Sequence, residues 1–203
     1  MRSLIFVSIF IVGAFAMNAQ TNQPANSTSG ISLDEQKTLV QIFEQEKMAR
    51  DVYTQIGEKF GIKILKNAAI GKQKQMSQIL DLLALNQANI AFDDAQGVFR
   101  NAELTEHYNA FLAEGLGSLN NAFRVGAKME DYNIYQIDKV LSSTTNDKLV
   151  LLFSKLSCSS GNELKTQVNM LVGNGEMFMP DYISVKLYRS IMHDNHEYCG
   201  NNM

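Results

Sequence analysis

The feature that most constrains this chain is the spacing of its apolar residues. Its 203 residues include only two prolines, Pro24 and Pro180, and between them the apolar residues recur at intervals of three and four. These intervals place apolar side chains on one face of an α-helix, whereas a half-buried strand needs an interval of two. The pattern therefore predicts an all-α domain.

Capping and stop signals indicate where the helices begin and end. Ser32 and Glu35 have the spacing of a capping box, and Gly61 is a stop signal, so we expect a first helix from about 33 to 60. Four long helices with short additional ones predict a four-helix bundle. The remaining long helices are expected at 65–85, 118–141 and 147–172, and the short ones at 103–114 and 184–192.

The first 19 residues have the pattern of a secretory signal peptide. Arg2 precedes an apolar run from Leu4 to Phe15, and small residues permit cleavage after Ala16 or Ala19. The run is too short to span a membrane, and no later apolar run reaches that length. We therefore predict an exported protein, periplasmic or secreted, with no membrane span in its mature chain.

The remaining chain divides by composition. Residues 20–31, rich in Asn, Ser and Thr, predict a flexible leader, residues 32–192 a single helical bundle, and residues 193–203 a C-terminal tail. The formal net charge of −3 does not provide the basic face that a nucleic-acid partner requires. We therefore expect no nucleic-acid binding.

The two cysteines and the tail histidines are further candidates for chemistry. Export allows a disulfide between Cys158 and Cys199, while two free thiols remain the alternative. His193 and His196 have helical spacing and form a weak candidate metal site, with Cys199 as a third ligand if it is reduced. The alternative is a polar terminal extension tied down by Cys199. The chain lacks a nucleophile motif, a phosphate loop and a Cys-x-x-Cys motif, so we assign no catalytic residue.

Each long helix carries polar residues in the middle of its apolar face. These residues are Glu46 in the first, Lys72 and Gln75 in the second, Glu130 in the third and Glu163 in the fourth. A single glutamate near the edge of an apolar face usually extends to water. Because buried carboxylates are costly unless they are paired or bind a metal, their recurrence on four helices predicts a shared central site.

Several segments resemble, in order, those of the bacterial domain-of-unknown-function family 2202 (DUF2202), a ferritin-like family. They are FEQEKMARDVY (43–53), GVFRNAELTEHYNAFLAEG (97–115), FRVGAKMEDYNI (123–134), LSCSSGNEL (156–164) and MPDYISVKLYRSI (179–191). The resemblance implies a ferritin-like four-helix bundle, a fold in which inward Glu and Glu-x-x-His ligands hold two metal ions.

The chain departs from this family at most of the ligand positions. Where family members read Ser-Glu-Gln-x-His-Met, this chain has Lys72 and Gln75, and where they read Ser-Arg-Asn-His-Leu it has Glu163. Glu46 and Glu130 keep the family's carboxylates. The resemblance therefore implies a degenerate di-metal site, with Glu46, Glu130 and Glu163 as vestigial metal ligands.

The substitutions suggest a role for the lysine. An ammonium group on Lys72 would neutralise inward carboxylates of Glu46, Glu130 or Glu163, while Gln75 would supply neutral hydrogen bonds. The alternative is that Lys72 extends out of the bundle to water. We hypothesise that Lys72 takes the place of the metal in a polar core network.

These observations predict an exported, non-catalytic structural or binding protein of the cell envelope that needs no cofactor. Self-association or binding to an envelope protein through a surface groove is compatible with it. The alternative is a metal-binding protein for iron or manganese handling, or an oxidase, in which Glu46, Glu130 and Glu163 hold Fe or Mn with Gln75 as an oxygen donor.

Overall fold

The structure is a computed structural model that describes residues 30–88, 90–194 and 199. These residues form α-helices and no strand, which confirms the predicted all-α bundle. The observed helix ends lie within two residues of those expected from the sequence. The helices are α1 (Leu33–Phe60), α2 (Lys63–Leu85), α3 (Ala102–Gly115), α4 (Leu119–Leu141), α5 (Asp147–Gly173) and α6 (Val185–His193).

Side-chain caps account for most of the helix starts. The capping box at the start of α1 is formed, because the Ser32 hydroxyl accepts the Glu35 N–H and the Glu35 carboxylate accepts the Ser32 N–H. α1 ends at Gly61, whose φ of 66° lies in the left-handed region that glycine adopts without strain. The other helices that begin with a side-chain cap do so at Asn101, Ser118, Asn146 and Ser184.

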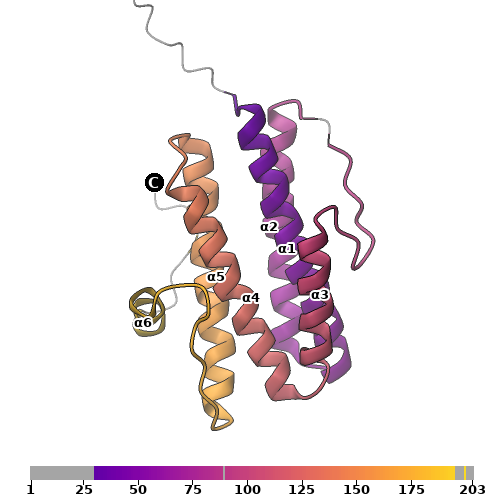
Figure 1. The fold of residues 1–203 in the computed structure, drawn as a ribbon, viewed down its shortest axis with the longest axis vertical. Coiled ribbons are helices and arrows are strands. Elements are labelled where there is room, and N and C mark those ends of the chain that lie inside the picture. Colours follow the sequence, from indigo (N-terminus) through magenta and orange to yellow (C-terminus); the bar gives the residue numbers. More distant parts are fainter. Residues whose placement is uncertain (1–29, 89, 195–198, 200–203) are drawn as a thin grey trace, which may run out of the picture.

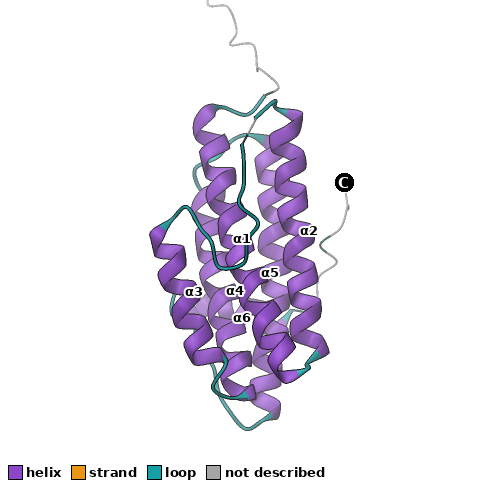
Figure 2. Ribbon diagram, turned by 90° about the vertical axis from the view of Figure 1, so that its right-hand side faces the viewer, coloured by secondary structure: helices purple, strands orange, loops and turns teal. Residues whose placement is uncertain are grey.

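The long helices pack as two pairs. α1 packs along α2, and α4 packs along α5 (Figure 1). α3 contacts both α1 and α4, and α6 contacts α5 (Figures 1 and 2). No helix in the described part of the chain is long and apolar enough to cross a membrane.

The core consists of two separate apolar clusters. One lies toward the beginning of α1 and the other toward its end, and both receive residues from α1, α2, α4 and α5. Members of the first cluster include Leu39, Phe43, Met76, Ile79, Ile137, Phe153 and Leu156, and members of the second include Val52, Ile56, Leu65, Phe123, Leu164, Val168 and Leu171. The residues between them belong to the polar site described below.

Buried carboxylates hold the connecting segments against the bundle. Glu44 accepts the backbone N–H groups of residues 100–101, and Asp51 accepts that of Gly97. Asp131, which is fully buried, accepts three backbone N–H groups from residues 181–183. The sequence reasoning assigned no role to these carboxylates, although a buried carboxylate is stable where it accepts several N–H groups.

The predicted N-terminal segments fall mostly outside the described residues. The predicted signal peptide and residues 20–29 of the predicted leader are not described. Ile31, the last residue of the predicted leader, is buried, and its N–H donates to the Asn86 side chain over 2.9 Å. Ile31 is therefore packed against the bundle and is not part of a flexible leader.

Candidate functional site: a buried polar layer

A polar layer separates the two apolar clusters at mid-length of the four long helices. Each helix passes from one cluster to the other through this layer, so the layer receives side chains from α1, α2, α4 and α5. Its buried members are Gln45, Glu46, Lys72, Gln75, Glu130, Asn133, Ser160 and Gln167. The structure therefore brings together four of the predicted inward residues: Glu46, Lys72, Gln75 and Glu130.

The ammonium group of Lys72 lies between two carboxylates. Its Nζ is 2.7 Å from Glu130 Oε2 and 3.1 Å from Glu46 Oε2, and it also donates to Ser160 Oγ over 3.3 Å. The Lys72 side chain is 1 % exposed, and those of Glu46 and Glu130 are 0 % exposed. Lys72 thus points into the bundle. The alternative prediction, that its side chain extends out of the bundle to water, is wrong.

Glu130 is the best-satisfied carboxylate of the layer. Besides Lys72 on Oε2, it accepts the Tyr53 hydroxyl on Oε1 over 3.0 Å. The Asn133 amide donates to Oε2 over 3.5 Å and itself accepts a 2.8 Å hydrogen bond from Gln45. These contacts fix Glu130 in place with partners from α1, α2 and α4.

Several buried polar atoms of the layer lack a hydrogen-bond partner. Among the described residues, Glu46 Oε1 accepts no hydrogen bond, while the Lys72 ammonium lies 3.1 Å from Glu46 Oε2. Gln75 Oε1 and both polar atoms of the Gln167 amide also have no hydrogen-bond partner among the described residues. Buried polar atoms without partners cost stability, so the layer is incompletely satisfied.

The pKa shifts follow from burial and charge. Burial raises the pKa of Glu46, the Lys72 charge opposes this, and the Glu130 charge adds to it. Burial alone would lower the pKa of Lys72, but the attraction of Glu130 and Glu46 outweighs it and raises that pKa above its ordinary value. The ammonium group is therefore charged at neutral pH.

Glu163 lies at the edge of the layer. It is half-buried, and no ion pair joins it to another described residue. Burial raises its pKa to about 7, with a further contribution from Glu130 and an opposing one from Lys72. Of the three predicted vestigial ligands, Glu163 is thus the one that the Lys72 ammonium does not contact.

The residues present do not match a metal centre. In the described part of the chain, no three or more His, Cys, Asp or Glu side chains are placed to hold one ion. The Lys72 ammonium also lies within 3.1 Å of both central carboxylates, where a cation bound between them would meet its charge. The arrangement fits an internal ion-pair cluster better than a di-metal site.

The other predicted residues lie away from this layer. Cys158 and Cys199 form a disulfide, so the thiol ligand considered for the tail is not free. His193 is the exposed last residue of α6, and His196 lies outside the described residues.

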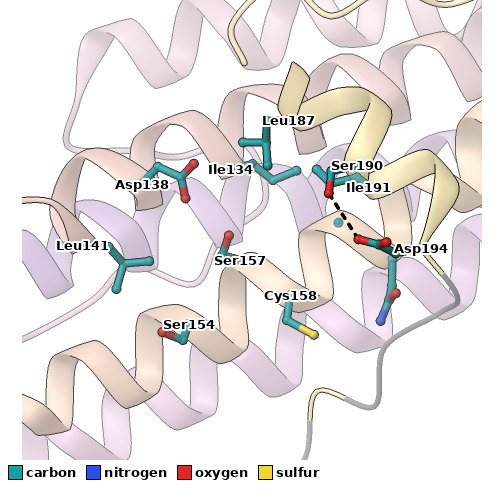
Figure 3. Close-up of a pocket in the computed structure, with 12 residues that line it drawn as sticks. Ile134, Asp138, Leu141, Ser154, Ser157, Cys158, Leu187, Ser190, Ile191 and Asp194 are labelled. Carbon is teal, nitrogen blue, oxygen red and sulfur yellow. Dashed lines mark hydrogen bonds between the residues drawn. The ribbon is translucent and has the colours of Figure 1, made fainter. Parts of the chain in front are cut away.

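A groove of about 390 Å³ lies between α4, α5 and α6 (Figure 3). Asp138 and Ser157 line it, and Ser190 donates a 3.3 Å hydrogen bond to Asp194 at its other side. Burial raises the pKa of Asp138. Of the residues predicted as sites, only Cys158 lines this groove.

The comparisons with known proteins agree on one relationship. The family model described as "Uncharacterized protein domain (DUF2202)" matches residues 35–195. "Uncharacterized protein MJ0754" of Methanocaldococcus jannaschii is 33 % identical over 168 residues, which cover 82 % of this chain and 91 % of that protein. The crystal structure of that hypothetical protein superposes with a TM-score of 0.78, covering 82 % of this chain and 96 % of the other. The residues that the family model matches, 35–195, include nearly the whole of the four long helices.

Proposed function

The chain belongs to the DUF2202 family, and from that premise we propose that it is an exported ferritin-like bundle whose di-metal site is degenerate. An internal ion-pair cluster replaces the metal, and the protein serves as a non-catalytic structural or binding protein of the cell envelope. It needs no bound metal to fold. Its partner, whether a second copy or another envelope protein, binds at the surface.

The observation that carries this proposal is the position of the Lys72 ammonium between Glu46 and Glu130, 3.1 and 2.7 Å from their oxygens. The Lys72 ammonium stabilises the two carboxylates as a bound metal ion would, because opposite charges at this distance attract one another strongly where water is excluded. Gln75 is the second residue of α2 that departs from the ligand pattern of the resembled family, and its side chain is neutral and buried.

A second candidate is a metal-binding protein for iron or manganese handling, or an oxidase. Glu46 Oε1 and Gln75 Oε1, which accept no hydrogen bond from a described residue, favour it, because buried oxygen atoms without donors are potential ligands of a hard cation. Metal binding would require the Lys72 ammonium to leave its position or lose its proton. The raised pKa of Lys72 opposes the loss of its proton.

The deciding experiment is elemental analysis of residues 20–203, purified without a His tag and exposed in turn to Fe²⁺, Mn²⁺ and Zn²⁺. The comparison variant is Glu46→Ala/Glu130→Ala. We expect no stoichiometric metal in either protein. Stoichiometric metal in the wild type that is lost in the variant would establish the second candidate instead.

A further inference from the structure

The groove of about 390 Å³ between α4, α5 and α6, which we call the α6 groove, is apolar along part of its lining. Ile134 and Leu141 of α4 and Leu187 and Ile191 of α6 supply this part (Figure 3). Ile134 is buried, and the other three side chains are partly exposed. Covering them with a hydrocarbon chain releases the water that contacts them, which favours the binding of such a chain.

Two carboxylates lie at opposite sides of the α6 groove (Figure 3). Asp138 of α4 accepts a hydrogen bond from the Ser157 hydroxyl of α5. Asp194 directly follows α6, and Ile191, one turn before it, lies next to Gly161 of α5. Because residues 157 and 161 are separated by about 6 Å along the axis of α5, a ligand that contacts both carboxylates must be elongated.

Neither carboxylate forms an ion pair in the described part of the chain. Asp138 is half-buried, and burial raises its pKa more than the Ser157 hydrogen bond lowers it. Lys165 donates to the main-chain carbonyl of Asp194 and forms no ion pair with its carboxylate. An unpaired carboxylate that is partly removed from water is stabilised when a cation binds beside it. Each side of the groove therefore attracts a positive charge.

The charge of the lining selects a cationic ligand. Among the described residues that line the α6 groove, the only charged side chains are Asp138 and Asp194. The remaining polar lining is neutral and includes the hydroxyl groups of Ser154 and Ser190. A carboxylate accepts hydrogen bonds from an ammonium group and repels an anion. An apolar lining between two carboxylates therefore matches a hydrocarbon chain with an ammonium group at each end.

We propose that the α6 groove binds a linear diamine, with one ammonium group on Asp138, the other on Asp194 and the methylene chain against Leu187 and Ile191. Such a diamine carries both charges at neutral pH, because an alkylammonium group has a pKa of about 10, as lysine does. The inference goes beyond the proposed function, since it concerns the surface beside α6 and needs no residue of the polar layer. It therefore stands whether or not the polar layer binds a metal.

The test is an NMR titration of the isotope-labelled protein at neutral pH and low salt, with calorimetry for affinity. The ligands are putrescine, cadaverine and hexamethylenediamine at millimolar concentrations, which differ only in the length of the methylene chain. Butylamine, pentylamine and hexylamine, the monoamines of the same chain lengths, are the ligand controls. We expect at least one diamine to shift the amide signals of the groove residues and to bind about fivefold more tightly than its matching monoamine.

The variants Asp138→Asn and Asp194→Asn each remove one charge with little change in size. The matched control, Asp81→Asn, makes the same change at an exposed position of α2 outside the groove. Each groove variant should weaken the binding of the diamine about fivefold, and the control should leave it unchanged.

Three results would overturn the proposal. The first is that no diamine shifts the groove signals, and the second is that either groove variant binds the diamine as tightly as the Asp81→Asn control does. The third is that the matching monoamine binds as tightly as the diamine. The peptide acetyl-Lys-Gly-Lys-amide is tested in parallel. If this peptide shifts the groove signals and no diamine does, the groove is a site for a basic peptide.

Discussion

Replacing Lys72 by methionine tests the polar layer by removing its only cation while keeping most of the side-chain volume. In the wild type the ammonium lies within 3.1 Å of both Glu46 and Glu130, whose side chains are 0 % exposed. In the variant two buried carboxylates face each other without a positive charge. Removing one partner of a buried ion pair generally costs about 3–5 kcal/mol, because the remaining charge has no compensation.

Proton uptake limits this cost and makes it depend on pH. The variant can neutralise one carboxyl group by protonation, which costs about 1.4 kcal/mol for each pH unit above the ordinary value of 4.5. That cost is about 3 kcal/mol at pH 7 and about 1.4 kcal/mol at pH 5.5. The folded variant then binds more protons than the unfolded chain, so its stability rises as pH falls. We expect Lys72→Met to be less stable than wild type by about 3–5 kcal/mol near pH 7 and by about 1–3 kcal/mol near pH 5.5.

Urea denaturation followed by circular dichroism at the two pH values measures this difference. Lys74→Met is the matched control, because Lys74 is an exposed lysine of the same helix. A triple variant, Lys72→Met/Glu46→Gln/Glu130→Gln, removes the three charges of this ion-pair cluster and should recover most of the lost stability. The reasoning is refuted if Lys72→Met is no less stable than the Lys74→Met control, or if its deficit is the same at both pH values.

Three further predictions concern other parts of the molecule. Burial raises the pKa of Glu163 to about 7, so the folded state holds an extra proton between the ordinary value of 4.5 and about 7, and stability falls as pH rises through this window. Glu163→Gln should match wild type near pH 5 and exceed it by about 1–3 kcal/mol near pH 8 in urea denaturation, and parallel pH profiles would contradict this. The disulfide between Cys158 and Cys199 spans 41 residues, so replacing both by serine should lower the free energy of unfolding by about 2–4 kcal/mol, and an unchanged denaturation midpoint would argue against it. Asp131→Asn should cost about 2–4 kcal/mol and speed hydrogen exchange at the amides of residues 181–183, whereas unchanged exchange there would exclude the anchoring role.

The helices could be predicted closely because their signals are local. Ser32 with Glu35 and the left-handed Gly61 mark the ends of α1 within a few residues of sequence. The inward direction of Lys72 and Glu130 also follows from the helical period, since each lies in register with apolar neighbours that are buried.

The contacts between distant segments could not be predicted in the same way. Asp131 is buried because residues 181–183 fold over it, and no local pattern connects these two parts of the chain. Tyr53 and Tyr132 are both buried tyrosines of the long helices, but their surroundings differ. Tyr53 donates to Glu130, whereas Tyr132 lies against His107 and Tyr182. The rotation of each helix about its axis decides between these positions, and the period determines that rotation only roughly.

The most direct test of the central claim is a crystal structure of residues 20–203 grown with excess Mn²⁺, with anomalous diffraction data collected for manganese. We predict no anomalous peak between Glu46 and Glu130, and density for the Lys72 ammonium within hydrogen-bonding distance of both carboxylates. A strong anomalous peak between the two carboxylates, with the Lys72 side chain displaced, would contradict the claim that the lysine takes the place of the metal.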